Sequence, residues 1–244
     1  MEESADIYPK TRWTVVARAV SPDSAVCQRA LGDLYNLYKS PVYCCIRRRG
    51  LDHHNAEELT HDYFLSLLKR DYLAEADPHK GKFRAFIQAD LKLFLNNALR
   101  KQHALKRGGG ANVIPHDDAN AEHDCEGAYG SSLDPEAMFD REWAKATFAA
   151  ALEALKQSYQ APDRAVVFET LAPLLDKPSR PGMYEAAASQ LGMKEATVKV
   201  AMTRLRERLG RALEQVVADT LDDPTPTAIR DEIRYLFSVL AASS

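Results

Sequence analysis

Hydrophobic positions recur at spacings of three and four along most of the chain, which is the period of a helix with one buried face. The pattern predicts helices at 25–38, 41–50, 56–70, 83–103, 136–158, 163–175, 183–190, 194–219 and 226–241. No long stretch alternates between apolar and polar residues as a half-buried strand does. The sequence therefore predicts an all-α protein.

Local signals predict where some of these helices begin. Asn55 and Glu58 have the spacing of a capping box at the start of a helix. Pro41 predicts a break between two helices, because proline has no N–H for the interior of a helix. Asp134 and Pro135 are the residues expected at the cap and in the first turn of the helix that opens the second half.

The stretch 104–133 separates the helices into two groups. It has no sustained apolar period and is rich in Gly, Asp, Asn and Ser, a composition typical of a flexible linker. A structureless loop of that length is unusual inside one compact domain. We therefore expect two small helical domains at 1–103 and 134–221, joined by a flexible acidic linker, and a C-terminal helical extension at 222–244.

Charge is strongly segregated, although the net formal charge is only −3. Residues 80–107 hold eight Lys or Arg and one acid, whereas 108–140 hold eight acids and no Lys or Arg. Residues 194–211 hold six cations and two acids. Blocks of alternating sign are typical of a protein with several charged partners.

Other sequence features exclude some locations and chemistries. No run approaches the roughly 20 apolar residues of a membrane helix, and the N-terminus lacks the cationic and apolar regions of a secretory signal. The four cysteines have no CxxC spacing and are expected to be free thiols; they are Cys27, Cys44, Cys45 and Cys125. We expect a cytoplasmic protein without membrane insertion, metal or cofactor.

The segment YEAAASQLGMKEATVKVAMTRLRERL, residues 184–209, has helix-turn-helix spacing. Ala188 is small enough for two helices to approach closely, and Gly192 can adopt the left-handed conformation that ends a helix. Val198, Ala201 and Leu205 are the expected buried stripe of the second helix. Such a second helix reads base edges in the major groove of DNA.

The DNA-facing candidates are the residues on the outward, N-terminal part of this second helix. They are Lys194, Glu195, Ala196, Lys199, Val200, Thr203 and Arg204. Taken alone, the same pattern is compatible with an ordinary helical hairpin that has a solvated basic face.

The N-terminal half contains an ordered set of segments: TRW (11–13), LGDLYNLYKSPVYCCIRRRG (31–50), AEELTHDYFLSLLKR (56–70) and DPHKGKFRAFIQADLKLFLNNALRKQHALKRGGG (77–110). Together they resemble region 2 of bacterial sigma factors of the two-domain extracytoplasmic-function type, and 184–209 resembles region 4. The resemblance covers roughly 11–110 and 134–217. At 98–101 the chain reads ALRK, where many members of the family have DxxR.

The resemblance implies a non-catalytic protein that binds core RNA polymerase and directs promoter recognition and strand opening. It implies contacts with the clamp helices and the flap of the polymerase, and with promoter DNA; an anti-sigma factor is a common further partner in the family. The implied polymerase-binding residues are Glu57, Glu58, Leu59, Asp62 and Phe64. The implied residues for strand opening and duplex contact are Tyr72, Lys80, Lys82, Phe83, Arg84, Asn96, Asn97, Arg100 and Lys101.

Two other interpretations remain open from the residues alone. The first is a stand-alone helix-turn-helix regulator with an N-terminal helical sensing domain. The second is a metal-dependent enzyme, because His54, Glu57, Glu58, His61 and Asp62 are ligand types, although they lack the HExxH order. The C-terminal helix could pack on the helix-turn-helix domain, contact a partner or inhibit the protein.

Overall fold

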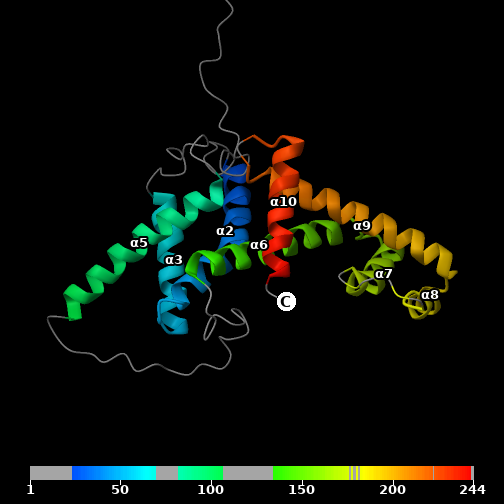
Figure 1. Ribbon diagram of the computed structural model, residues 1–244, viewed down its shortest axis with the longest axis horizontal. Coiled ribbons are helices and arrows are strands. Elements are labelled where there is room, and N and C mark those ends of the chain that lie inside the picture. Colours follow the sequence, from blue (N-terminus) through cyan, green and yellow to red (C-terminus); the bar gives the residue numbers. More distant parts are fainter. Residues whose placement is uncertain are drawn as a thin grey trace, which may run out of the picture. The chain divides into compact units, whose positions relative to one another are not determined.

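The computed structural model describes residues 24–69, 82–106, 134–175, 177, 180, 182–221 and 223–242. Its elements, in order, are α2 (Ser24–Arg47), α3 (His53–Lys69), α5 (Phe83–Lys106), α6 (Pro135–Gln157), α7 (Pro162–Leu171), the short 3-10 helix η2 (Ala172–Leu174), α8 (Glu185–Leu191), α9 (Glu195–Ala218) and α10 (Pro226–Ala241) (Figure 1). These described ranges contain no strand. The prediction of an all-α fold is confirmed for them.

The chain divides into two compact units. The first unit contains residues 1–146 and 218–244, and the second contains residues 147–217. The division therefore falls inside α6, and α10 belongs to the first unit together with α2, α3 and α5. The predicted linker at 104–133 lies outside the described residues, apart from the end of α5.

Helix α2 continues through Pro41, so the predicted break at this proline is wrong. Proline removes one intrahelical hydrogen bond. Here the surrounding turns are deeply buried, with Tyr38 1% exposed and both Val42 and Ile46 0% exposed. Burial of each such side chain contributes about 1.5–3 kcal/mol, which offsets the lost bond.

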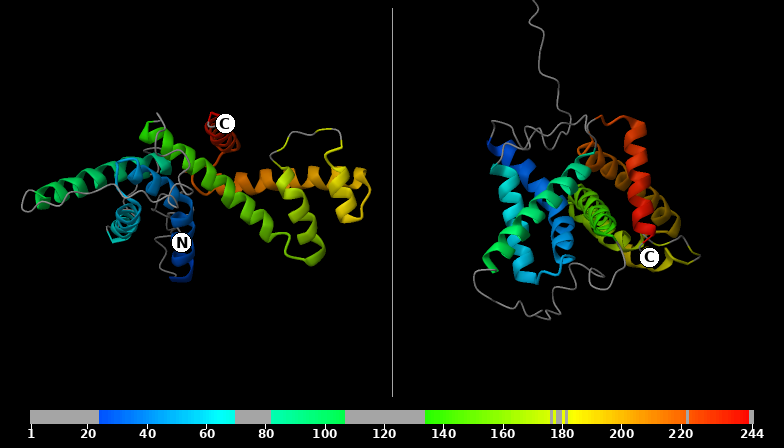
Figure 2. Two further views of the ribbon diagram at one scale, coloured as in Figure 1. Left: turned by 90° about the horizontal axis from the view of Figure 1, so that it is seen from below. Right: turned by 60° about the vertical axis from the view of Figure 1, so that its left-hand side comes forward.

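Helices α2, α3 and α5 of the first unit lie against one another (Figure 2), and aromatic rings fill the contacts between them. The ring of Tyr38 on α2 meets the ring of Phe83 on α5 edge to face, with the centroids 5.5 Å apart. Tyr63 on α3 packs in the same manner against Phe94 on α5, at 5.3 Å. The hydroxyl of Tyr63 donates a hydrogen bond to the carbonyl of Ile87 at 3.4 Å. These contacts fix α2, α3 and α5 against one another.

Asp52 caps α3, and the helix begins before the predicted cap at Asn55. The backbone N–H of Asn55 donates to Oδ1 of Asp52 at 2.9 Å. This hydrogen bond stabilises the carboxylate and lowers the pKa of Asp52. Asn55 therefore lies in the first turn, where it donates to the cap residue and does not act as the cap.

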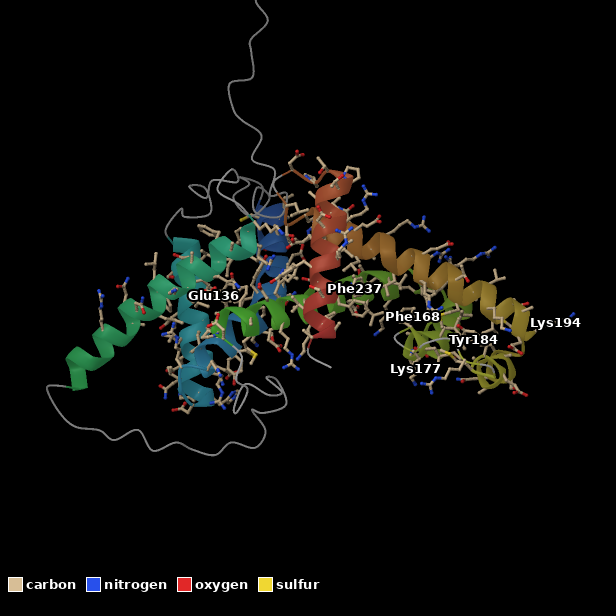
Figure 3. All side chains as sticks on the ribbon, in the orientation of Figure 1. Glu136, Phe168, Lys177, Tyr184, Lys194 and Phe237 are labelled. Carbon is tan, nitrogen blue, oxygen red and sulfur yellow. The ribbon has the colours of Figure 1, made fainter. Side chains whose placement is uncertain are left out.

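The core of the second unit surrounds α9. Phe168 on α7, Tyr184 before α8, and Val198 and Leu205 on α9 are all buried in one hydrophobic cluster. Figure 3 shows Phe168 and Tyr184 on the side of α9 that faces α7 and α8, with Lys194 at the far end of the helix. The core thus fixes which face of α9 is covered.

The cysteines differ from the expectation in one respect. Cys44 is disulfide-bonded, so the prediction of a free thiol is wrong for this residue. Cys45 is not disulfide-bonded, and its Sγ–H donates to the carbonyl of Pro135 at 3.3 Å. Burial raises the pKa of Cys45 to about 12, so the thiol stays protonated at neutral pH. Within the described ranges, no helix is long and apolar enough to cross a membrane.

Candidate nucleic-acid interface

Gly192 joins α8 to α9 through a left-handed turn. Its φ is 62°, a conformation that favours glycine. The N–H of Gly192 donates to the carbonyls of Ala188 and Ser189, and the N–H of Met193 donates to the carbonyl of Ala188 at 3.0 Å. These bonds satisfy the last carbonyls of α8 and turn the chain sharply into α9, as the sequence predicted.

The two faces of α9 have opposite character in its first three turns. Val198, Met202 and Leu205 are 0%, 1% and 1% exposed and face the core of the second unit. Ala201, predicted to be buried, is partly buried, and Met202 supplies the central core contact that the sequence analysis did not assign. The predicted outward residues are all exposed: Lys194, Glu195, Ala196, Lys199, Val200, Thr203 and Arg204.

This exposed face combines cations with polar and apolar groups. Nζ of Lys199 pairs with Oε1 of Glu195 at 2.8 Å, and both side chains remain largely in solvent. The hydroxyl of Thr203 donates to the carbonyl of Lys199. Val200 is 50% exposed, although it is an aliphatic residue. The face can therefore offer charge, hydrogen-bonding groups and an apolar contact to one ligand.

Two cations further along α9, Arg206 and Arg208, make contacts with their own unit. Nη2 of Arg206 donates to the carbonyl of Lys177 at 3.4 Å. The guanidinium of Arg208 lies over the ring of Tyr159, 5.2 Å from its centroid. Arg204 remains exposed. Arg211, beyond the middle of the helix, is exposed as well, so accessible positive charge extends along α9 past its N-terminal turns.

Helix α3 in the first unit presents an acidic face. Glu57, Glu58 and Asp62 are exposed, as a docking surface for a cationic partner requires. Phe64 is only 9% exposed and packs edge to face on Tyr35, with ring centroids 5.0 Å apart. The ring of Phe64 is therefore part of the core in this conformation, and its role in docking stays a prediction.

Leu65 is the apolar residue of α3 that sequence analysis missed. It is 46% exposed and lies three residues after Asp62, so both point to the same side of the helix. Leu59, the other predicted apolar contact, is partly buried. The hydrophobic period could have identified Leu65, because it lies on the face of the helix opposite the core positions Tyr63 and Leu67.

The histidines of α3 pair with the acidic residues of the same helix. Nε2 of His53 lies 3.6 Å from Glu57, and Nε2 of His54 lies 3.5 Å from Glu58. Nδ1 of His53 also shares a hydrogen bond with the hydroxyl of Tyr43 at 2.7 Å. Across the part of the chain that the structure describes, no three His, Cys, Asp or Glu side chains converge as metal ligands do.

The start of α5 differs from the expectation for exposed DNA-stacking residues. Phe83 is 0% exposed and stacks on Phe86 at 5.7 Å. Its proposed role as a base-stacking ring is therefore not compatible with this conformation. Lys82 and Arg84 are both paired with Glu232 of α10. Arg84 is 11% exposed, so it is not presented to a phosphate.

The remaining candidates on α5 are accessible where the structure describes them. Asn96, Asn97 and Arg100 are exposed on the C-terminal half of the helix. Leu93, which precedes them by one turn, is 59% exposed. Tyr72 and Lys80 lie outside the described residues, as does the side chain of Lys101.

No protein-family model, curated protein or solved structure matches the chain. The resemblance to sigma factors therefore rests on the sequence segments quoted above.

Proposed function

We propose that this protein is an alternative sigma factor, which binds core RNA polymerase and directs promoter recognition, strand opening and transcription initiation. The observation that carries the proposal is the exposed N-terminal face of α9 behind the left-handed turn at Gly192. In this interpretation, α8 and α9 form a helix-turn-helix whose second helix enters the major groove.

The chemistry of this face suits duplex DNA. Lys194 and Lys199 can neutralise phosphates, and each neutralised phosphate releases condensed counterions. Glu195 can accept a hydrogen bond from the amino group of cytosine, and the exposed methyl groups of Val200 can contact the 5-methyl group of thymine. The buried stripe of Val198 and Leu205 would hold these groups on one rigid helix.

The acidic face of α3 suits a cationic protein partner. Carboxylates such as those of Glu57, Glu58 and Asp62 form bidentate hydrogen bonds with arginines. Leu65 would add an apolar contact at the same face. Clamp helices of the polymerase are the partner that the sequence resemblance implies for this helix.

A stand-alone helix-turn-helix regulator could use the same face of α9, and the two functions differ in their dependence on polymerase. The free chain carries a net formal charge of −3, which disfavours strong association with DNA by this chain alone. Core polymerase would bind the first unit and deliver the second unit to its DNA element, which raises the effective concentration of that unit.

A footprint on a promoter fragment with and without core polymerase tests the proposal. Protection is expected only when both the chain and core enzyme are present. Lys199→Ala should weaken the upstream part of the footprint, whereas Lys156→Ala, a change of an exposed lysine at the end of α6, should leave it unchanged. A footprint of equal strength without core enzyme would favour the stand-alone regulator.

A further inference from the structure

Helix α10 buries a carboxylate on its apolar face. Glu232 is 2% exposed, and Leu236, one turn later, is 0% exposed. A buried carboxylate is unfavourable unless cations and hydrogen bonds compensate it. Both oxygens of Glu232 have a cationic partner: Oε1 accepts from Nε of Arg84 at 3.0 Å, and Oε2 accepts from Nζ of Lys82. The helix is therefore anchored at the start of α5 by charge as well as by apolar packing.

Arg84 is the centre of this cluster and also binds α6. Its Nη1 donates to Oδ1 of Asp140 at 2.7 Å. The hydroxyl of Tyr235 on α10 donates to Oδ2 of the same carboxylate at 2.5 Å. The guanidinium lies over the ring of Tyr235, 4.2 Å from the centroid, and over the ring of Trp143, 4.8 Å away. Three helices of the first unit thus meet around one arginine.

The pKa shifts of Arg84 and Tyr235 are consistent with this cluster of hydrogen bonds and ion pairs. Burial alone would lower the pKa of Arg84, but the carboxylates of Glu232 and Asp140 raise it overall. Burial and the hydrogen bond to Asp140 raise the pKa of Tyr235. Arg84 and the hydroxyl of Tyr235 therefore both stay protonated, and both continue to donate hydrogen bonds, across the pH range around neutrality.

The contact of α10 with α5 and α6 resembles a permanent structural interface and differs from an inhibitory contact that covers DNA-binding residues. An inhibitory contact must open when DNA arrives, so it should be exposed and easily separated. Here a phosphate could reach Arg84 only if the buried carboxylate of Glu232 and the partly buried carboxylate of Asp140 gave up the cation that they share, which is unfavourable. An inhibitory role for α10 therefore does not fit the burial of Glu232 and Arg84.

Lys82 is the residue of this cluster whose side chain is accessible to a ligand. Its side chain is 47% exposed, and its ammonium has three donors, of which Glu232 takes one. Its Nζ also lies 5.8 Å from the centroid of the Tyr235 ring. A lysine loses much rotamer freedom when it is ordered by a ligand. Glu232 and Tyr235 order Lys82 beforehand, so less of that freedom is lost on binding.

We infer that α10 is a fixed part of the first unit in which Glu232 is a positioning residue: it holds Lys82 at the start of α5 for a phosphate of the opened promoter strand. This inference rests on the proposed function. It assigns to the C-terminal helix a role in strand opening, where the alternatives were packing on the helix-turn-helix domain, contact with a partner, or self-inhibition.

The test separates promoter binding from promoter opening in the holoenzyme. Open-complex formation is followed by the fluorescence of 2-aminopurine in the melted region, at several holoenzyme concentrations. Glu232→Gln should lower the opening rate by about tenfold, the effect of one charge-assisted contact, and leave closed-complex affinity within about twofold. A promoter with a mismatched, already open segment should restore full activity. Asp231→Asn, which changes an exposed acid paired with Arg234 on the same helix, should alter neither quantity.

A double-mutant cycle distinguishes positioning from general destabilisation. Lys82→Ala should lower the opening rate to the same extent as Glu232→Gln, and the double variant should be no slower than either single variant. Tyr235→Leu removes the ring beside Lys82 and leaves Glu232 in place, so it provides a second variant with the same direction of effect, should Glu232→Gln fold poorly.

Three results would overturn the inference: an unchanged opening rate in Glu232→Gln, a faster one, or additive losses in the double variant. A faster rate would identify α10 as an inhibitory helix. If the unaltered chain forms no open complex with core enzyme, the proposed function fails and the inference fails with it; the three results above require that the unaltered chain does open the promoter.

Discussion

Replacement of Arg84 by methionine should destabilise the first unit more than any single change on the surface of α10. The substitution removes the cation shared by Glu232 and Asp140, whose side chains are 2% and 15% exposed. Breaking a buried ion pair by removing one partner costs about 3–5 kcal/mol. Glu232 keeps Lys82, and Asp140 keeps Gln88 and Tyr235, so we expect the lower end, about 3 kcal/mol.

Urea unfolding followed by tryptophan fluorescence measures this loss, because Trp143 lies directly under Arg84. The matched control is Arg234→Met, which breaks an exposed pair with Asp231 and should cost less than about 1 kcal/mol. The double variant Arg84→Met with Glu232→Gln should cost less than the sum of the two single changes, since fewer buried charges remain unpaired. If Arg84→Met lowers the free energy of unfolding no more than the control does, the description of this cluster as a buried ion-pair network is refuted.

Three further changes test the local structure and the DNA face. Gly192→Ala should destabilise the second unit by about 1 kcal/mol, from the left-handed φ alone, since a Cβ there meets no atom within 4 Å. The control Gly210→Ala, inside α9, should stabilise it by up to about 1 kcal/mol in the same denaturation experiment, and equal effects would contradict the turn geometry. Asp52→Ala should cost about 1 kcal/mol through loss of the cap of α3. The folded-state pKa of Asp52 lies below its ordinary value of 3.8. The part of the stabilisation that depends on the charge of Asp52 is therefore present above pH 3.8 and declines as the pH falls below it. A pH titration of stability that shows the opposite sign would exclude Asp52 as the cap. Lys194→Ala should reduce the slope of log affinity against log salt by about 0.9, measured with the holoenzyme on promoter DNA, and an unchanged slope would remove Lys194 from the phosphate contacts.

Periodicity predicted the helices well because most of them bury one face. The predicted range 226–241 coincides with α10, and the predicted helices around Gly192 differ from α8 and α9 by only one or two residues at their ends. The predictions at Pro41 and Asn55 failed because burial of neighbouring side chains or a competing hydrogen bond overrode the local sequence rule. Pro41 does not break α2, because apolar side chains on both sides are buried. Asn55 donates to Asp52 and so lies inside the helix that it was expected to cap.

The candidate sites were predictable only where a single helix determines which residues are exposed. The outward face of α9 follows from the helical period, since its buried stripe lies on the opposite side. The burial of Arg84 could not follow in this way, because its partner Glu232 is 148 residues distant in the chain. One signal was present: Glu232 occupies a position in the apolar stripe of α10 with Leu236, and a charged residue at such a position predicts a cationic partner.

In vitro transcription with core RNA polymerase from the same cells, on fragments of the cognate genome, tests the central claim most directly. We expect new transcripts only when the chain is added, with start sites that share a common pair of upstream elements, and we expect Lys199→Ala to reduce them. The contradicting result is the absence of new start sites across the genome under conditions in which the same core enzyme responds to another sigma factor.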